Sequence, residues 1–115
     1  MKILFNNKKD DLLSRLQKQE PAAQKIFYEQ NVKQFISVSK SYVSDIYQAE
    51  DCVIKAFCKI FKSIETFRGE GNLESWARKI VVNECLNFIK SHKTVFYIDD
   101  IHPSFLEDSH DEITD

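Results

Sequence analysis

Apolar residues recur along this chain at the three- and four-residue spacing of α-helices, and no stretch of useful length shows the alternation of a β-strand. The pattern predicts a short helix over residues 10–19. It predicts a second helix from Pro21, a residue that suits the first helical position, to about Val43. One face of the first helix is expected to carry Leu12, Leu13 and Leu16. The expected buried stripe of the second helix is Tyr28, Val32, Phe35, Ile36, Ser39, Tyr42 and Val43.

A third helix is predicted over residues 46–64, after a break at Ser44 and Asp45. Asp45 followed three residues later by Gln48 is a variant of the capping box, in which a side-chain oxygen accepts a hydrogen bond from a free backbone N–H of the first turn. The core line expected for this helix is Ile46, Ala49, Val53, Phe57, Ile60 and Ile64. The side chains expected to face away from the core are Gln48, Asp51, Lys55, Cys58 and Lys62.

Residues 66–83 hold both glycines of the chain and its only tryptophan, in a charged loop that leads into a fourth helix. Asn72 is a good N-cap for this helix, which is expected to continue to about Lys93. Its polar face carries Trp76, Lys79, Asn83, Asn87 and Lys90. Its apolar face carries Leu73, Ala77, Ile80, Val81 and Phe88. A mobile glycine loop beside a face that can donate hydrogen bonds, stack and offer positive charge suits single-stranded or opened nucleic acid.

The charge distribution divides the chain into a basic body and an acidic tail. All 16 Lys and Arg lie in residues 1–93, together with 11 acidic residues, whereas residues 94–115 contain the other seven acidic residues. This asymmetry indicates a polyanionic partner. We expect residues 99–115 to be mobile, because their like charges and few apolar side chains cannot offset the entropy cost of ordering. The 115 residues therefore predict one compact all-α four-helix bundle over residues 1–93, followed by an acidic, flexible C-terminal segment.

Cysteine, histidine and hydropathy patterns exclude several classes. The three cysteines form no C-x-x-C motif and stand in helical patterns, so we expect reduced thiols in a cytoplasmic protein: Cys52, Cys58 and Cys85. A zinc site from Cys85, His92, His102 and His110 matches no common ligand spacing, so neither metal nor cofactor is expected. No uncharged apolar run approaches the ~20 residues of a membrane span. The apolar start, residues 1–5, is too short for a signal peptide.

The sequence also lacks the residue patterns of an enzyme. It contains neither a P-loop nor an H-E-x-x-H motif. No Ser-His-Asp set can be assembled, because the three histidines cluster at or beyond the end of the last expected helix. Glu50 and Asp51 are adjacent and point about 100° apart on a helix, which makes them poor partners for acid–base catalysis.

The residues of the glycine loop and the fourth helix have structural explanations as well. Trp76 can be a core anchor, since large aromatic side chains at helical spacing mostly serve packing. Asn83 can be an exposed polar residue with no ligand. Arg68 and Glu70 can form an ion pair across solvent, worth under about 1 kcal/mol. These explanations stay open beside the nucleic-acid hypothesis.

Three blocks occur in a fixed order: A-E-D-C-V-I-K-A-F over residues 49–57, F-R-G-E-G over 67–71 and W-A-R-K-I-V-V-N over 76–83. Together they resemble region 2 of the extracytoplasmic-function (ECF) sigma factors of bacterial RNA polymerase, over roughly residues 10–93. Those proteins carry an A-E-D-L-V-Q-E-V-F helix, an F-R-G-E/D-G/S loop and a W-L-x-R-I-A-x-N helix. The order and spacing of all three blocks make the resemblance specific, whereas any one block alone is weak.

The resemblance implies a helical sigma-2 domain whose helix 46–64 docks on the clamp helices of the polymerase β′ subunit. The implied polymerase-binding residues are Gln48, Glu50, Asp51, Lys55 and Lys62. It also implies that loop 66–72 holds a flipped base of the −10 promoter element and that helix 72–90 reads its non-template strand and helps to melt it. The implied DNA-binding residues are Phe67, Arg68, Gly69, Glu70, Gly71, Asn72, Trp76, Lys79, Asn83, Asn87 and Lys90.

Further partners and segments follow from the same resemblance. Many members are held by an anti-sigma factor, which makes such a protein an expected partner. A complete member has a second, sigma-4 domain for the −35 element, and this chain stops before one. Residues 94–115 are then expected to begin the linker between the two domains.

Three positions depart from the family pattern, and two other functions remain open. Ile54 and Lys55 stand where the family usually has Gln and Glu, and Asn87 stands where Asp is common. Lys55 inverts a charge on the presumed polymerase-binding helix. One alternative is a helical regulator that places helix 72–90 in the major groove of duplex DNA. The other is a protein-interaction bundle, such as an anti-sigma-like adaptor, in which the glycine loop is only a connection.

Overall fold

The computed structural model describes residues 11–100 of the chain, and the side chains of residues 11–92. A short N-terminal helix covers residues 11–17. It is followed by α2 (Pro21–Lys40), α3 (Ile46–Ser63), a 3₁₀ turn η1 (Ile64–Thr66) and α4 (Leu73–Asp100). The described residues contain no strand, which confirms the predicted all-α fold. No helix among them combines the length and apolar character of a membrane span.

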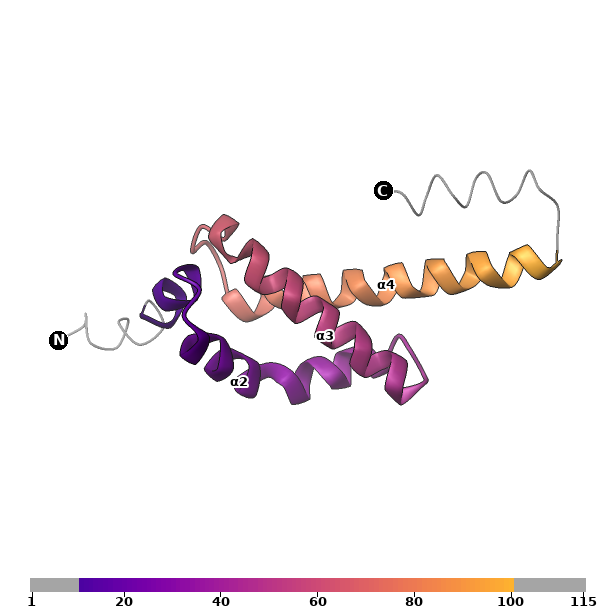
Figure 1. The fold of residues 1–115 in the computed structure, drawn as a ribbon, viewed down its shortest axis with the longest axis horizontal. Coiled ribbons are helices and arrows are strands. Elements are labelled where there is room, and N and C mark those ends of the chain that lie inside the picture. Colours follow the sequence, from indigo (N-terminus) through magenta and orange to yellow (C-terminus); the bar gives the residue numbers. More distant parts are fainter. Residues whose placement is uncertain (1–10, 101–115) are drawn as a thin grey trace.

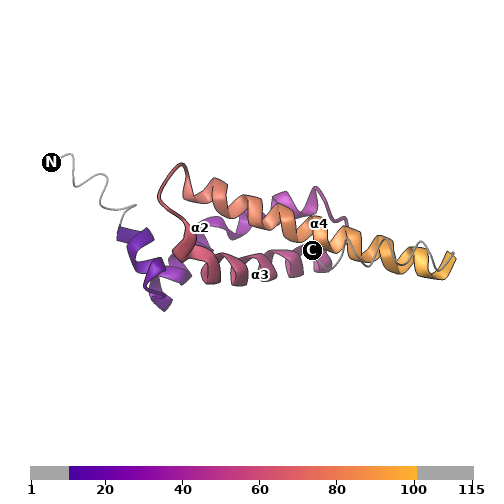
Figure 2. The same ribbon diagram turned by 90° about the horizontal axis from the view of Figure 1, so that it is seen from above.

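Helices α2, α3 and α4 pack against one another in pairs, so that the core lies between the three. The N-terminal helix sits beside the end of α3, next to the loop that leads into α4 (Figure 1). At the other end of the molecule, α4 continues well past the other helices (Figures 1 and 2). The loop and the free end of α4 therefore lie far apart.

The predicted helix starts are confirmed by their backbone and side-chain contacts. Pro21 is the first residue of α2, where its missing N–H costs no hydrogen bond. The side chain of Asp45 accepts a hydrogen bond from the backbone N–H of Gln48 over 3.0 Å. At α4, Asn72 Oδ1 accepts one from the backbone N–H of Ser75 over 3.0 Å. Each cap satisfies one of the N–H groups that a first helical turn leaves free.

The core line of α3 is confirmed except at its first member. Ala49, Val53 and Ile60 are buried, whereas Ile46 is 37% exposed because it lies in the first turn, at the end of the bundle. On α4, the central positions Ala77 and Val81 are fully buried, as predicted. The other three residues of that predicted apolar face are partly buried and pack against the core: Leu73, Ile80 and Phe88.

The predicted stripe of α2 is wrong at two tyrosines. Tyr28 is 39% exposed and Tyr42 is 43% exposed, whereas Phe27 is fully buried and Asn31 is 3% exposed. Asn31 tolerates burial because its Nδ2 donates to the backbone oxygen of Phe27 over 2.9 Å. Because the polar Asn31 stands on the buried face of α2, the apolar residues alone indicated the wrong face. The sequence pattern therefore placed Tyr28 in the core in place of Phe27.

Helix α4 also ends later than expected, at Asp100 instead of about residue 93. No glycine or proline interrupts the sequence between Gly71 and Pro103. Residues 94–98 are all β-branched or aromatic. Because such residues lower helix propensity only slightly, the helix continues through them. Most of the predicted mobile tail, residues 101–115, lies outside the described residues.

A buried polar contact joins all three core helices. The Ser39 hydroxyl on α2 donates to the backbone oxygen of Ala49 on α3 over 2.8 Å. The Cys85 thiol on α4 donates to Ser39 Oγ over 3.3 Å. Burial, with a smaller effect of the nearby Cys85, raises the pKa of the Cys52 thiol to about 11. Cys52 therefore stays protonated at neutral pH, and its buried side chain contributes to core packing.

Replacing Phe27 tests the observed phase of α2. The ring of Phe27 contacts the rings of Phe57 and Phe61 edge-on, with centroids 6.3 Å apart in both pairs. We expect Phe27→Ala to lower the free energy of unfolding by about 3–5 kcal/mol, because it leaves a cavity between α2 and α3. Urea denaturation followed by circular dichroism measures this change.

The matched control for that substitution is Tyr28→Ala. Tyr28 also touches Phe57, with centroids 4.8 Å apart, but it is partly in solvent. We expect Tyr28→Ala to cost less than half as much as Phe27→Ala. Equal costs for the two variants would contradict the assignment of Phe27 to the core and Tyr28 to its edge.

Candidate nucleic-acid interface

The loop between η1 and α4 is anchored at its start by Phe67. The backbone N–H of Phe67 donates to the oxygen of Ile64 over 3.2 Å, which closes the 3₁₀ turn. Its side chain is only 8% exposed, and its ring lies 5.4 Å from the ring of Trp76. Phe67, one of the DNA-binding residues implied by the family resemblance, thus has a largely buried ring that anchors the start of the loop.

Both glycines of the loop have a backbone that other residues rarely adopt. Gly69 has φ of 81° and Gly71 has φ of 80°, in the left-handed region. A Cβ at either position would meet no atom within 4 Å, so the backbone angle, and not lack of space, favours glycine there. Without side chains, these residues leave their backbone N–H groups accessible to a ligand.

An open hollow lies between this loop and the first turns of α4. Its volume is about 430 Å³, within the range of small-ligand pockets. The lining residues are Thr66, Phe67, Arg68, Glu70, Gly71, Asn72, Ser75, Trp76 and Lys79. We call it the Trp76 hollow. An open hollow thus lies where a pocket was predicted, and the binding of a base there stays a prediction.

Polar and aromatic groups around the Trp76 hollow fit a nucleotide. Trp76 is half-buried, so it packs against the core and also presents ring surface to the hollow. Arg68 and Glu70 are exposed and form no ion pair with each other in the described structure. Thr66 and Ser75 add two hydroxyls that the sequence analysis did not identify. Ser75 could have been found, because it stands one turn before Lys79.

The rest of the predicted polar face of α4 is in solvent. Lys79, Asn83, Asn87 and Lys90 are all exposed and follow the Trp76 hollow along the helix. Asn72 differs from them, because its side-chain oxygen is occupied by the cap of α4 and only its amide N–H₂ is left for a ligand. Two lysines and two amides along one helix can hold phosphates and base edges of an extended strand.

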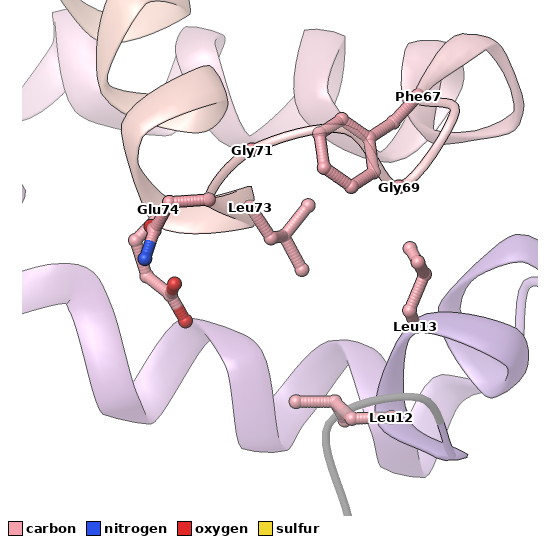
Figure 3. Close-up of a pocket in the computed structure, with 8 residues that line it drawn as sticks. Leu12, Leu13, Phe67, Gly69, Gly71, Leu73 and Glu74 are labelled. Atoms are coloured by element: carbon pink, nitrogen blue, oxygen red, sulfur yellow. The ribbon is translucent and has the colours of Figure 1, made fainter. Parts of the chain in front are cut away.

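A second, smaller hollow lies on the other side of the loop, against the N-terminal helix (Figure 3). Its volume is about 200 Å³, and its lining is mostly apolar. The residues are Leu12, Leu13, Phe67, Gly69, Gly71, Asn72, Leu73 and Glu74. The sequence did not predict it, because its two walls come from segments more than 50 residues apart.

The predicted polymerase-binding residues lie on α3, and none of them lines the Trp76 hollow. All of them are exposed: Gln48, Glu50, Asp51, Lys55 and Lys62. Lys55 Nζ lies 3.1 Å from Asp51 Oδ2, one turn earlier on the helix. The hydrogen bond to Asp51 raises the pKa of Lys55. Ile54, which precedes Lys55 in the sequence, is 56% exposed. This part of α3 therefore offers an apolar contact beside the Asp51–Lys55 ion pair.

The N-cap of α4 can be tested without any ligand. Because Asn72 satisfies a backbone N–H of α4, Asn72→Ala should cost about 0.5–2 kcal/mol in the free energy of unfolding. Asn72→Asp keeps the acceptor oxygen and should restore most of this loss. Asn83→Ala, an exposed asparagine elsewhere on α4, should change it by less than about 0.5 kcal/mol. Urea denaturation of the three variants separates these outcomes, and equal stability of Asn72→Ala and Asn83→Ala would contradict the capping role.

Comparison with known proteins agrees with the all-α fold. Residues 27–95 match the sigma-70 region 2 family. The RNA polymerase sigma factor SigV of Bacillus subtilis (strain 168) is 32% identical over 72 residues, which is 63% of this chain and 43% of that protein. The chain thus spans less than half of the length of this relative. Since the family match covers more than half of the chain and contains α3, the glycine loop and most of α4, the chain belongs to the sigma-70 region 2 family, and its resemblance to ECF sigma factors is confirmed.

Proposed function

We propose that this domain is a transcription initiation factor domain that binds core RNA polymerase and recognises and melts the −10 promoter element. The observation that carries the proposal is the Trp76 hollow, which lies directly before the exposed polar face of α4. Family membership supports the same role. The domain does this by binding alone and needs no catalytic group.

Promoter melting requires that extruded bases find new partners. Removing a base from the stack costs a few kcal/mol, and stacking on an aromatic side chain returns about 1–3 kcal/mol. In this proposal one base of the non-template strand enters the Trp76 hollow. There the ring of Trp76 offers a stacking surface, and the backbone of Gly71 offers close approach.

The neighbouring nucleotides then follow α4. Trp76, Lys79 and Asn83 are spaced three and four residues apart, which places them on successive turns of the same side of the helix. The amide of Asn83 can pair with a base edge, whereas Lys79 and Lys90 can lie near phosphates. A basic body of modest charge gives weak affinity for free DNA, so polymerase contributes the remaining phosphate contacts.

The outer side of α3 is the proposed docking surface for the clamp helices of the β′ subunit. It lies opposite the core-facing line of α3, so docking leaves the bundle intact. The same exposed surfaces could be covered by an anti-sigma factor, which we propose as a further partner. In the alternative functions, the Trp76 hollow has no role: a duplex-binding regulator inserts α4 into the major groove, and an adaptor binds only protein.

Substitutions on α4 should separate base recognition from phosphate binding. Asn83→Ala should cost about 1–3 kcal/mol in binding a single-stranded −10 oligonucleotide and should relax preference at one position. Lys79→Ala should weaken binding to all sequences about equally. It should also reduce the slope of log affinity against log salt concentration, called the salt slope below, by about one. The measurement is oligonucleotide affinity, with each base varied in turn and salt fixed, then with salt varied.

A third variant in the same experiment tests the loop. Gly69→Val forces a β-branched residue into the left-handed region and should distort the loop and weaken binding of the captured base. If Asn83→Ala and Gly69→Val leave both affinity and base preference unchanged, the promoter-reading assignment is wrong. The protein-interaction bundle is then the better explanation.

The polymerase surface is tested by charge reversal at Asp51. Asp51→Arg breaks the exposed ion pair with Lys55, which contributes only about 0.3–0.5 kcal/mol to stability, so the fold should survive. We expect Asp51→Arg to weaken binding to a β′ clamp-helix fragment by at least tenfold in a pull-down or titration, because like charges in a contact are unfavourable. Glu29→Arg, the same charge change on the exposed side of α2, is the control and should bind as the parent does. Parent-like binding by Asp51→Arg would count against this surface.

A further inference from the structure

The N-terminal helix, which precedes the family match, is tied by its side chains to the start of the glycine loop. Gln17 Nε2 donates to the backbone oxygen of Phe67 over 3.1 Å and to that of Ile64 over 3.3 Å. Gln19 Nε2 donates to the backbone oxygen of Phe61 over 2.8 Å. Figure 1 shows this helix beside the loop. The loop is therefore held from outside the residues matched to sigma-70 region 2, which begin at position 27.

The carbonyl groups that receive these bonds lie at the end of α3 and around η1, and that of Ile64 also accepts from the backbone N–H of Phe67. The last C=O groups of a helix lack intrahelical N–H partners. Phe61 belongs to the last turn of α3, Ile64 begins η1, and Phe67 is the first residue after η1. One amide group of Gln17 thus spans the 3₁₀ turn and fixes the point where the loop leaves it.

Apolar contacts of the same helix bound the loop from below. Leu12 and Leu13 line the small hollow of Figure 3, and Leu13 points across it toward Phe67 and Leu73. Phe67 also lines the Trp76 hollow and contacts the ring of Trp76. Phe67 thus lines both hollows and connects the N-terminal helix to the Trp76 hollow.

The turn after the N-terminal helix is itself held in an unusual conformation. Gln19 has φ of 61°, and it is the only described residue other than glycine with a positive φ. Its side chain is fixed at both ends, since Nε2 binds Phe61 and Oε1 accepts from Gln24 Nε2 over 2.9 Å. Backbone strain of this kind persists only where several contacts enforce it. The direction of the N-terminal helix is thus set by the end of α3.

We propose that Gln17 is a positioning residue, which sets the shape of the Trp76 hollow and thereby the selectivity for the captured base. This inference rests on the proposed function of the domain. A loop with two glycines has many accessible conformations, and a ligand must otherwise fix them at its own cost. With Gln17 in place, that ordering precedes binding. Phosphate contacts on α4 do not depend on it.

The experiment uses the tryptophan of the 115-residue chain as a reporter, since Trp76 is its only one and lines the hollow. Gln17→Met keeps the length of the side chain and removes both donors. Gln17→Asn keeps the amide on a shorter stem that cannot reach both oxygens. Gln30→Ala, an exposed glutamine of α2, is the control. Trp76 fluorescence is titrated with a single-stranded −10 oligonucleotide and with versions that carry each other base, at several salt concentrations.

In both Gln17 variants we expect discrimination at the captured base to fall by about three- to tenfold, the effect of losing one or two neutral hydrogen bonds. The salt slope and the preference read by Asn83 should stay as in the parent. Amide exchange at residues 68–72 should become faster in the free variants. A merely structural role for Gln17 would lower thermal stability and leave base discrimination unchanged far below the melting temperature. The control should match the parent throughout.

The outcomes distinguish this inference from the proposed function. If the parent discriminates between bases and either folded Gln17 variant discriminates equally well, the positioning role is wrong and the promoter-reading proposal stands. If the parent itself shows no base preference, the promoter-reading proposal fails first. If Gln17→Met does not fold, Gln17→Asn gives the decisive comparison, because it preserves a polar side chain at this site.

Discussion

The candidate site depends on the buried ring of Phe67 and its contact with Trp76. A segment with two left-handed glycines has no internal reason to keep one shape, and its backbone lies in solvent. Phe67 places an aromatic ring between the N-terminal helix and Trp76, so the start of the loop rests on buried contacts. The loop thus combines a fixed base with a free edge. That combination is what a pocket for one nucleotide needs.

Helix α3 separates the two proposed interactions. Its inner side provides much of the core and packs against both α2 and α4, while its outer side carries paired charges and an exposed isoleucine. The Lys59–Glu84 ion pair joins α3 to α4 at the edge of the core. In the proposed function, polymerase docks on the outer side of α3 and nucleic acid binds along α4, so the two partners contact different residues.

Much of this arrangement could be predicted from sequence, because it depends on local rules. The caps at Asp45 and Asn72 follow from short polar side chains before amphipathic runs, and the left-handed loop follows from the placement of two glycines. Two details could not be predicted. The buried Asn31 breaks the apolar pattern of α2, and its satisfaction by Phe27 is visible only in three dimensions. The contacts of Gln17 join segments almost 50 residues apart, and no local pattern encodes them.

The length of α4 has a geometric consequence. At 1.5 Å per residue, its 28 residues form a rod of about 42 Å, with the Trp76 hollow at one end and Asp100 at the other. Because the rod has no glycine or proline within it, the length of the helix sets the distance between the hollow and Asp100. One residue inserted into the part of α4 that extends past the other helices would rotate Asp100 by about 100° about the helix axis, while the first turns of α4 stayed in place. The number of residues in α4 thus sets both how far Asp100 lies from the hollow and on which side of the helix axis it stands.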